Sequence, residues 1–213
     1  MRHVLYNACY ILRSMPRHVD HDARREEIAD VAAALIASRG PANVSLRSLA
    51  AATGGSTSAV THYFADRREL LQHAYRAAIR HARARIDAIA DDQPDPLRAY
   101  CEAVLPLDSD RRRDWQTWVA FHGAAVGDPA LAEMQRWRVT AFREMLAEVI
   151  AAEQAAGAID RSLDPATESR HLLSLVHGIA SEAAFDEDDW PAERQYALLD
   201  RALGHLRTPV QLS

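Results

Sequence analysis

The stretch SLRSLAAATGGSTSAVTHY, residues 45–63, decides the fold of this chain. Ser45 and Ser56 are good first residues for helices, because a serine side chain accepts a hydrogen bond from an unpaired amide of the first helical turn. Between them, Gly54 and Gly55 interrupt the helical pattern and predict a tight turn. The stretch therefore predicts two short helices joined by a glycine turn, as in a helix-turn-helix. The alternative is an ordinary hairpin of two helices inside a helical core.

The residues on either side extend this unit. Apolar residues recur at helical spacing over residues 23–38, and Gly40 followed by proline ends that helix. After the stretch, Asp66 and Glu69 form a capping box, which predicts a long fourth helix reaching about residue 90. Three short helices and one long helix thus form a compact N-terminal unit. We expect a helix-turn-helix DNA-binding domain over residues 23–70, which includes only the start of the long helix, preceded by an extension, residues 1–22, that we expect to be disordered.

The rest of the chain is also predicted to be helical. A polar, proline-containing run at 91–96 separates the long helix from residues that keep the helical spacing. The expected helices cover 97–105, 111–126, 129–156, 165–185 and 191–206. Strand-like alternation and apolar runs long enough to span a membrane are both missing from the sequence. We therefore expect an all-α fold of about nine helices, with a larger helical body at 71–208.

The charge of the chain is divided unevenly. Residues 24–90 carry ten arginines and six acidic residues, a net charge of +4, which leaves −9 for the remainder of a chain whose total is −5. DNA binding needs local cations to neutralise phosphates, whatever the total charge. The two cysteines, Cys9 and Cys101, lie far apart and form no metal-binding or disulfide pattern, which fits a reducing cytoplasm.

The N-terminal pattern resembles that of the TetR family of regulators. The resemblance rests on Val44 through Gly54, on Ser56 through the pair Tyr63-Phe64, and on Asp66-Arg67-x-Glu69-Leu70-Leu71, with matching order and spacing. Two features depart from the family pattern. Gly55 stands where an apolar residue usually packs the turn. Thr57 and Thr61 stand where lysine and tyrosine often reach the DNA backbone, which predicts an atypical base preference or weaker affinity.

The resemblance implies a set of DNA-contacting residues. Ser45 and Arg47 would touch phosphate or a base edge, and the helix that begins at Ser56 would enter the major groove. Tyr63 and Arg67 would bind phosphates. For Arg67 the position itself supports this, because a cation at a helix N-terminus opposes the helix dipole unless an anion is near. The full expected set is Ser45, Arg47, Ser56, Thr57, Ser58, Thr61, His62, Tyr63 and Arg67.

The C-terminal part resembles that of BetI-like members of the same family, on Asp114-Trp115-x-x-Trp118-x-x-Phe121 and Gly127-Asp128-Pro129. Aromatic side chains concentrate here and predict a mostly apolar effector pocket, with a plain hydrophobic core as the alternative. The expected pocket residues are Trp115, Trp118, Phe121, His122, Met134, Trp137, Arg138 and His171. By the resemblance the last two helices form a dimer interface. The expected interface residues are Leu172, Leu175, Val176, Ile179, Leu199 and Leu203.

These features together predict a ligand-responsive repressor. We expect a homodimer that binds a palindromic operator on double-stranded DNA and is released by a small, largely apolar or amphipathic effector, with no cofactor, metal or membrane partner. An enzyme is not indicated, because the sequence has no glycine-rich phosphate loop, HExxH, GxSxG or CxxC motif. The remaining alternative is a helical ligand-binding or protein-interaction module without DNA function.

Overall fold

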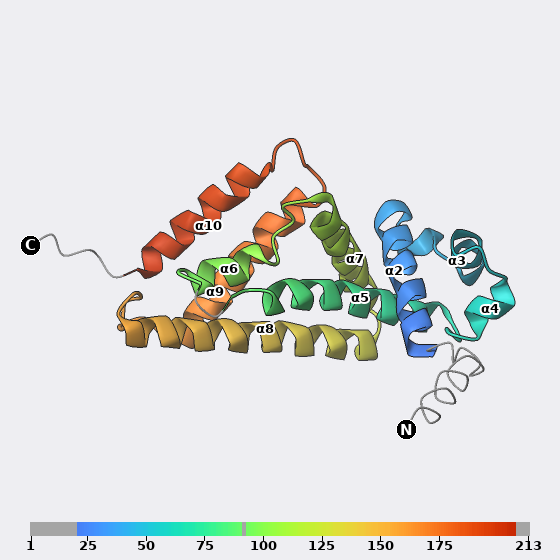
Figure 1. Ribbon diagram of the computed structural model, residues 1–213, viewed down its shortest axis with the longest axis horizontal. Coiled ribbons are helices and arrows are strands. Elements are labelled where there is room, and N and C mark those ends of the chain that lie inside the picture. Colours follow the sequence, from blue (N-terminus) through green and yellow to red (C-terminus); the bar gives the residue numbers. More distant parts are fainter. Residues whose placement is uncertain (1–20, 91–92, 208–213) are drawn as a thin grey trace, which may run out of the picture.

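The computed structural model describes residues 21–90 and 93–207, and this part of the chain is helical with no strand beyond one isolated bridge between Ile159 and Arg207. The described helices are α2 (His21–Arg39), the 3-10 helix η1 (Pro41–Asn43), α3 (Leu46–Ala52), α4 (Thr57–Thr61), α5 (Arg67–Asp87), α6 (Pro96–Glu102), α7 (Ser109–Ala125), α8 (Pro129–Ala156), α9 (Pro165–Ala183) and α10 (Ala192–Leu206). Figure 1 shows α2, α3 and α4 at one end of an elongated molecule, with α5 running from them into the body. The all-α prediction is confirmed.

The helix starts follow from local capping. Ser45 accepts a hydrogen bond from the amide of Ser48 at 3.1 Å, and the Ser48 hydroxyl accepts one from the amide of Ser45 at 2.9 Å. The Asp66 carboxylate accepts a hydrogen bond from the amide of Glu69 at 2.8 Å, while the Glu69 carboxylate reaches back to the amide of Ala65 at 2.7 Å. Each such bond satisfies an amide that the first helical turn leaves without a backbone partner. These helices therefore begin where the sequence predicted.

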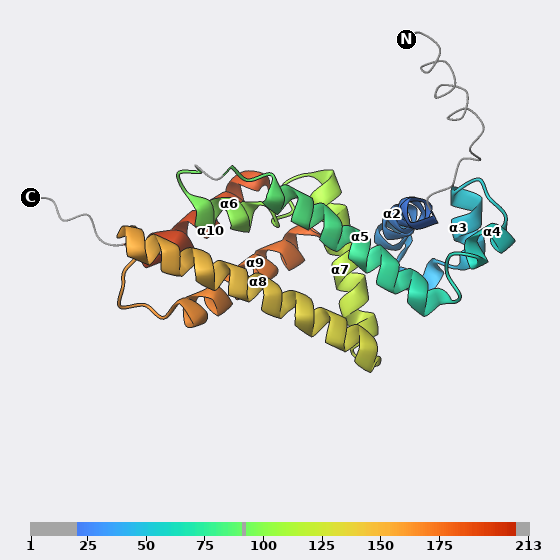
Figure 2. The same cartoon turned by 60° about the horizontal axis from the view of Figure 1, so that its bottom comes forward.

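Two apolar cores share one helix. The small core gathers residues of α2, α3 and α4 with Leu70, Ala74 and Ala77 of α5, and the large core takes Tyr75, Ala78 and other residues of α5 together with α6 to α10. Since α5 has one helical stripe in each core, it is a single rigid element common to both. Figure 2 shows α5 passing from the small end of the molecule into the body, where it runs near α8.

The two parts also meet through α2 and α7. The Thr117 hydroxyl of α7 donates a hydrogen bond to the carbonyl of Ala33 in α2 at 3.2 Å. Nearby, the buried carboxylate of Asp114 lies 2.8 Å from Nδ1 of His81 and 3.1 Å from a guanidinium nitrogen of Arg85, both on α5. The hydrogen bond that His81 forms with Asp114 raises the pKa of His81, although partial burial of the ring acts to lower it. This buried ion cluster joins α5 to α7 directly beneath the small domain.

Some predicted boundaries were wrong. The helix expected over 97–105 ends as α6 at Glu102, and three carbonyls at that end bind side chains. Arg111 donates to the carbonyl of Glu102 at 2.9 Å, Arg85 to that of Ala103 at 2.8 Å and Trp115 to that of Val104 at 2.5 Å.

Two further boundaries differ from the expected ones. The described part of α2 starts at His21, ahead of the expected Ala23, and residues 1–20 of the expected extension lie outside the described residues. The helix expected to reach Phe185 ends as α9 at Ala183. None of the helices in the described part of the chain has the length and apolar character needed to cross a membrane.

Candidate DNA interface and effector cavity

Helix α4 presents a small polar surface at the end of the molecule. Val60 is its one buried residue, at 1% exposure, and holds the helix against the small core. The other side of the short helix is exposed, and its side chains are Thr57, Ser58, Thr61 and His62. Side chains of this size leave a short helix free to approach base edges in a major groove about 12 Å wide. The helix-turn-helix geometry therefore places the predicted groove-facing residues on one accessible face.

The hydroxyl groups of α4 differ in whether they form hydrogen bonds within the chain. The Ser56 side chain caps α4 by accepting from the amide of Ala59 at 3.1 Å, and the Thr61 hydroxyl donates to the carbonyl of Ser58 at 3.0 Å. The Thr57 and Ser58 hydroxyls form no hydrogen bond with any described residue. Thr57 and Ser58 thus keep full donor and acceptor capacity for a partner outside the chain.

The arginines of α2, α3 and α5 fall into two groups. Arg24 pairs with Glu27 at 2.7 Å, and Arg80 pairs with Asp30 at 3.1 Å, so part of the local positive charge is neutralised within the domain. Arg47, at the start of α3, is exposed and pairs with no acidic residue in the described segments. It lines a surface concavity with Arg39 at the end of α2, a residue that the sequence analysis did not select. Arg39 lies in the last turn of α2, close in sequence to the helix-turn-helix, and this position could have indicated it as a candidate phosphate contact.

Tyr63 and Arg67 border the same surface. The half-buried ring of Tyr63 packs against His62 and His21 at centroid distances of 5.5 and 5.9 Å. Arg67 donates from Nη2 to the carbonyl of Pro41 at 2.6 Å. This bond fastens η1 to the start of α5, a structural role that the sequence did not indicate. Most of the Arg67 donor groups remain available, because a guanidinium carries five N–H bonds.

A cavity of about 210 Å³ lies between α5, α7 and α8 in the body. Its walls are largely apolar, and its lining residues are Ile79, Ala82, Arg83, Ile86, Val104, Trp118, Trp137, Arg138, Ala141, Phe142 and Met145. A much smaller void of about 10 Å³ adjoins it, next to Trp115 and His177. The volume is larger than the roughly 150 Å³ of an engineered apolar cavity that binds benzene.

Polar groups cluster at the inner wall of the cavity. The guanidinium of Arg138 lies over the Trp118 ring, 4.9 Å from its centroid, with Nη2 3.4 Å from Nε2 of His177. Burial lowers the pKa of His177 to about 4, and the positive charges of Arg138 and His122 act in the same direction. The indole nitrogen of Trp118 is buried without a hydrogen-bond partner in the described residues. Hydrogen-bond donors therefore outnumber acceptors at this wall.

The predicted pocket residues do not all line this cavity. Trp118, Trp137 and Arg138 do, and Trp115 borders the adjoining small void. Phe121, His122 and Met134 pack nearby without lining either space, with the Phe121 ring stacked on Tyr75 at 3.7 Å. His171 does not belong to the pocket: its side chain is 71% exposed and lies 3.4 Å from Glu168. The histidine that faces the small void is His177, six residues later on α9.

Several cavity residues were missed by sequence analysis. Ile79, Ala82 and Ile86 come from α5, and Met145 comes from α8, three residues after Phe142 of the predicted aromatic group. These residues recur at intervals of three or four positions, so the helical spacing was a usable signal. The pocket was predicted from aromatic side chains, which are concentrated on α7, and the aliphatic residues of α5 were therefore not included.

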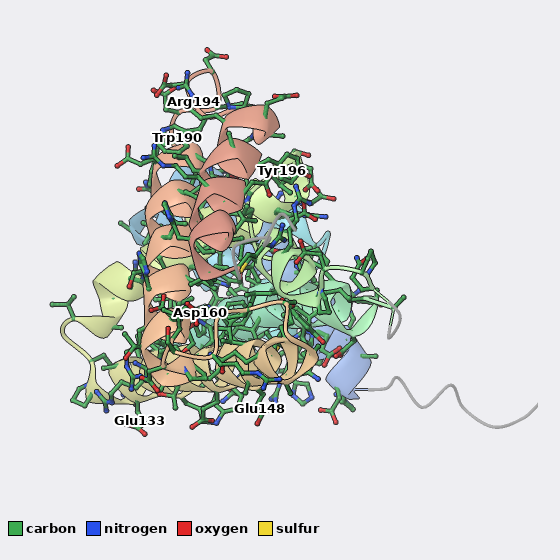
Figure 3. The ribbon with its side chains drawn as sticks, turned by 90° about the vertical axis from the view of Figure 1, so that its left-hand side faces the viewer. Glu133, Glu148, Asp160, Trp190, Arg194 and Tyr196 are labelled. Carbon is green, nitrogen blue, oxygen red and sulfur yellow. The ribbon has the colours of Figure 1, made fainter. Side chains whose placement is uncertain are left out.

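The predicted dimer residues need correction. Leu175 is half-buried, and the other five are buried within the single chain, each at 2% exposure or less. These five are Leu172, Val176, Ile179, Leu199 and Leu203. They form the apolar stripe by which α9 and α10 pack on the body, so they face the interior of this chain and not its surface. The opposite faces of the two helices are exposed, with Ser174 and Gly178 on α9 and Ala197 and Gly204 on α10. Figure 3 shows α9 and α10 side by side.

Comparison with known proteins agrees with this architecture. Residues 28–74 match the model for bacterial regulatory proteins of the tetR family, and residues 93–208, more than half of the chain, match the C-terminal domain of BetI-type transcriptional repressors. The transcriptional regulator PksA of Bacillus subtilis is 27% identical over 176 residues, which cover 81% of this chain and 84% of the relative. BetI of Stenotrophomonas maltophilia is 32% identical over 127 residues, which cover 57% of this chain and 64% of that protein.

Solved structures show the same fold. A transcriptional regulator from Rhodococcus sp. Rha1 superimposes with a TM-score of 0.76 and 27% identity, covering 85% of this chain and 95% of that one. A putative regulator from Saccharomonospora viridis, crystallised with choline, has a TM-score of 0.76 at 21% identity, with 86% and 97% covered. The chain therefore belongs to the TetR family of bacterial transcriptional regulators and carries a C-terminal domain of the BetI type.

Proposed function

We propose that this regulator is a ligand-responsive repressor that binds a palindromic operator as a homodimer and releases it when a small, largely apolar or amphipathic effector enters the cavity between α5, α7 and α8. The observation that carries DNA binding is the exposed face of α4, together with the unneutralised Arg47 and Arg39, which line a concavity on the neighbouring helix α3. Small polar side chains offer hydrogen bonds to base edges, and nearby arginines neutralise phosphates. By position, Tyr63 and Arg67 are further phosphate contacts.

A homodimer is required because one short helix contacts few base pairs. Two-fold dimers of helix-turn-helix domains place their reading helices in successive major grooves of a palindrome, about 34 Å apart. We assign the interface to the exposed faces of α9 and α10, where Ser174, Gly178, Ala197 and Gly204 allow two helices to approach closely. Phe185, which is 71% exposed just beyond α9, adds apolar area at the end of this face.

Helix α5 supplies the physical link between effector and DNA. Its residues Ile79, Ala82 and Ile86 line the cavity, while Leu70 and Ala74 lie in the small core. An effector that favours a different position of α5 would displace the small domain and change the separation of the two α4 helices in the dimer. The ligand shifts this equilibrium only by its difference in affinity for the two arrangements.

Binding of duplex DNA at several salt concentrations, followed by fluorescence anisotropy, tests the DNA function. We expect steep salt dependence, and Arg47→Ala or Arg39→Ala should each lower the slope of log affinity against log salt by about 1, since each removes about one phosphate contact. Arg136→Ala is the matched control, because Arg136 is exposed on α8 and pairs only with Glu133. Absence of binding would favour the alternative of a helical interaction module without DNA function, and binding that is equally insensitive to all three substitutions would contradict the roles of Arg47 and Arg39.

A further inference from the structure

The charged residues that line the effector cavity are all positive. Its only charged lining residues are Arg83 and Arg138, and no acidic residue lines it among the residues that the structure describes. Arg83 is paired with Asp87 at 2.7 Å, close to the surface. Arg138 is half-buried on the inner wall, and no carboxylate of the described chain lies within ion-pair distance of it. The cavity therefore contains one positive charge without a counter-ion.

The neighbours of Arg138 are neutral groups. Its Nε lies 3.5 Å from the side-chain oxygen of Gln135, and Nη2 lies 3.4 Å from Nε2 of His177. Because the pKa of His177 is lowered to about 4 by burial, and the pKa of Tyr75 is raised by burial, both side chains are uncharged at neutral pH. Arg138 also has a hydrogen-bond interaction with Tyr75. The contacts with Gln135 and His177 are long, none of the three partners carries a negative charge, and together they leave part of the five guanidinium N–H groups unused.

A partly desolvated cation of this kind is stabilised by an anion, and a guanidinium binds a carboxylate through two parallel hydrogen bonds. The rest of the cavity is aliphatic and aromatic, and its volume of about 210 Å³ suits a compact apolar group.

We propose that the effector is a small amphipathic carboxylate, in which an aryl or short acyl body fills the space between α5, α7 and α8 and the carboxylate pairs with Arg138. The inference rests on the proposed function of the cavity and adds the chemical class of its ligand. It also separates this protein from its choline-bound structural neighbour. A quaternary ammonium binds over an aromatic face, and here the guanidinium of Arg138 already occupies the face of Trp118.

Titration calorimetry with the full chain tests the ligand class. The probes are phenylacetate and hexanoate, their uncharged amides phenylacetamide and hexanamide, and choline. We expect each carboxylate to bind at least about tenfold more tightly than its amide, which is the usual effect of a hydrogen bond to a charged group. Choline should bind more weakly than either carboxylate and either amide. Amides that bind as well as the acids, choline that binds most tightly, or carboxylates that fail to bind at millimolar concentrations would each overturn the proposal.

Substitution of the arginine tests the site. Arg138→Met keeps an unbranched apolar stem and removes the charge, and it should weaken carboxylate binding about 10- to 100-fold while leaving amide binding unchanged. Arg136→Met, on the exposed side of the same helix, is the matched control and should change neither. Circular dichroism establishes that the variants fold, and Arg138→Lys should keep part of the preference for acids over amides. Equal losses for acid and amide would contradict the assignment.

Operator binding separates this inference from the proposed function. If carboxylates bind through Arg138 and DNA affinity stays constant, the ligand class is right and the proposed release of DNA is wrong. If DNA is released by the amides or by choline and not by the acids, the proposed function stands and the anionic effector is wrong. Release of DNA by phenylacetate or hexanoate in the wild-type protein, but not in Arg138→Met, supports both.

Discussion

The two ends of the molecule hold their functional groups in opposite ways. In the small domain the polar side chains of α4 lie on the surface, and the apolar residue Val60 below them is fully packed. In the body the polar groups of Arg138, Trp118 and His177 are turned inward beside a space that no side chain fills. A surface that reads DNA needs a rigid support and free hydrogen-bonding groups outside, whereas an effector site needs free groups and volume inside. One chain supplies both because α5 contributes residues to the small core and to the wall of the cavity.

The largest expected effect tests whether the two cores are separable. Phe64 is fully buried in the small core, and Phe64→Ala should cost about 4 kcal/mol of its free energy of unfolding. All four tryptophans lie in the body. In a denaturant titration, circular dichroism should therefore show an early transition while tryptophan fluorescence keeps its midpoint.

The matched control for Phe64 is Val126→Ala, at a side chain that is 91% exposed and should change stability by no more than about 0.5 kcal/mol. If both probes shift together in Phe64→Ala, the two regions unfold as one unit and the contrast drawn between them fails.

The second effect concerns the joint between the regions. Asp114→Asn leaves Arg85 and His81 without their buried partner and should destabilise the protein by about 3 kcal/mol. Because Asp114 joins α5 to α7, the midpoint of the fluorescence transition of the body should fall. Arg113→Ala, at an exposed neighbour that pairs only with Asp110, is the control. A loss under about 1 kcal/mol would mean that the cluster contributes little to the joint.

The third effect is a loss of stability in acid that arises in the body. Burial lowers the pKa of His177 to about 4, so the folded state holds this ring neutral where the unfolded chain would protonate it. The contribution is present above the unfolded pKa of about 6.5 and is lost as the pH falls toward 4, with an expected size of roughly 2 kcal/mol. The raised pKa of His81 acts with the opposite sign, since its contribution is lost as the pH rises above 6.5.

The measurement that isolates His177 is therefore the difference between wild type and His177→Gln, in unfolding experiments from pH 7 to pH 4. The wild type should lose more stability over this range than the variant. Parallel curves would show that His177 is not held neutral by its surroundings.

The smallest effects compare two adjacent glycines in the turn before α4. Gly54 has a φ of +67°, a conformation that L side chains rarely adopt, so Gly54→Ala should cost about 1 kcal/mol. Gly55 has no such constraint, and an added Cβ would meet Thr53 Oγ1 at 3.7 Å and the Ala59 Cβ at 3.9 Å, both ordinary contacts. Gly55→Ala should therefore stabilise the domain by about 0.5 kcal/mol. Thermal melts of the two variants, with wild type beside them, check the opposite signs.

The features that the sequence predicted best are local. The caps at Ser45, Ser56 and Asp66 involve residues within four positions of one another, and they locate α3, α4 and α5 almost to the residue. The groove-facing side chains follow from these starts, because a short capped helix with one buried residue has only one face left to expose. Packing between distant segments decided none of these positions.

The features that the sequence predicted poorly depend on how distant helices meet. The cavity lies between α5, α7 and α8, and no local sequence pattern predicts how closely these three helices pack. His171 and His177 are six residues apart on α9, which places them on different sides of the helix, and only the packing of α9 shows that His177 faces inward. For the same reason the leucines of α9 and α10 were assigned to a partner chain, although the core of their own chain buries them.

Selection of bound sequences from a random pool of DNA duplexes tests the central claim, that the exposed face of α4 reads bases. The wild-type chain should enrich a sequence with two inverted half-sites, and a Thr57→Ala, Ser58→Ala and Thr61→Ala triple variant should keep the salt dependence but lose or change the enriched bases. A pool that enriches nothing, or a triple variant that enriches the same sequence with the same affinity, would contradict the account.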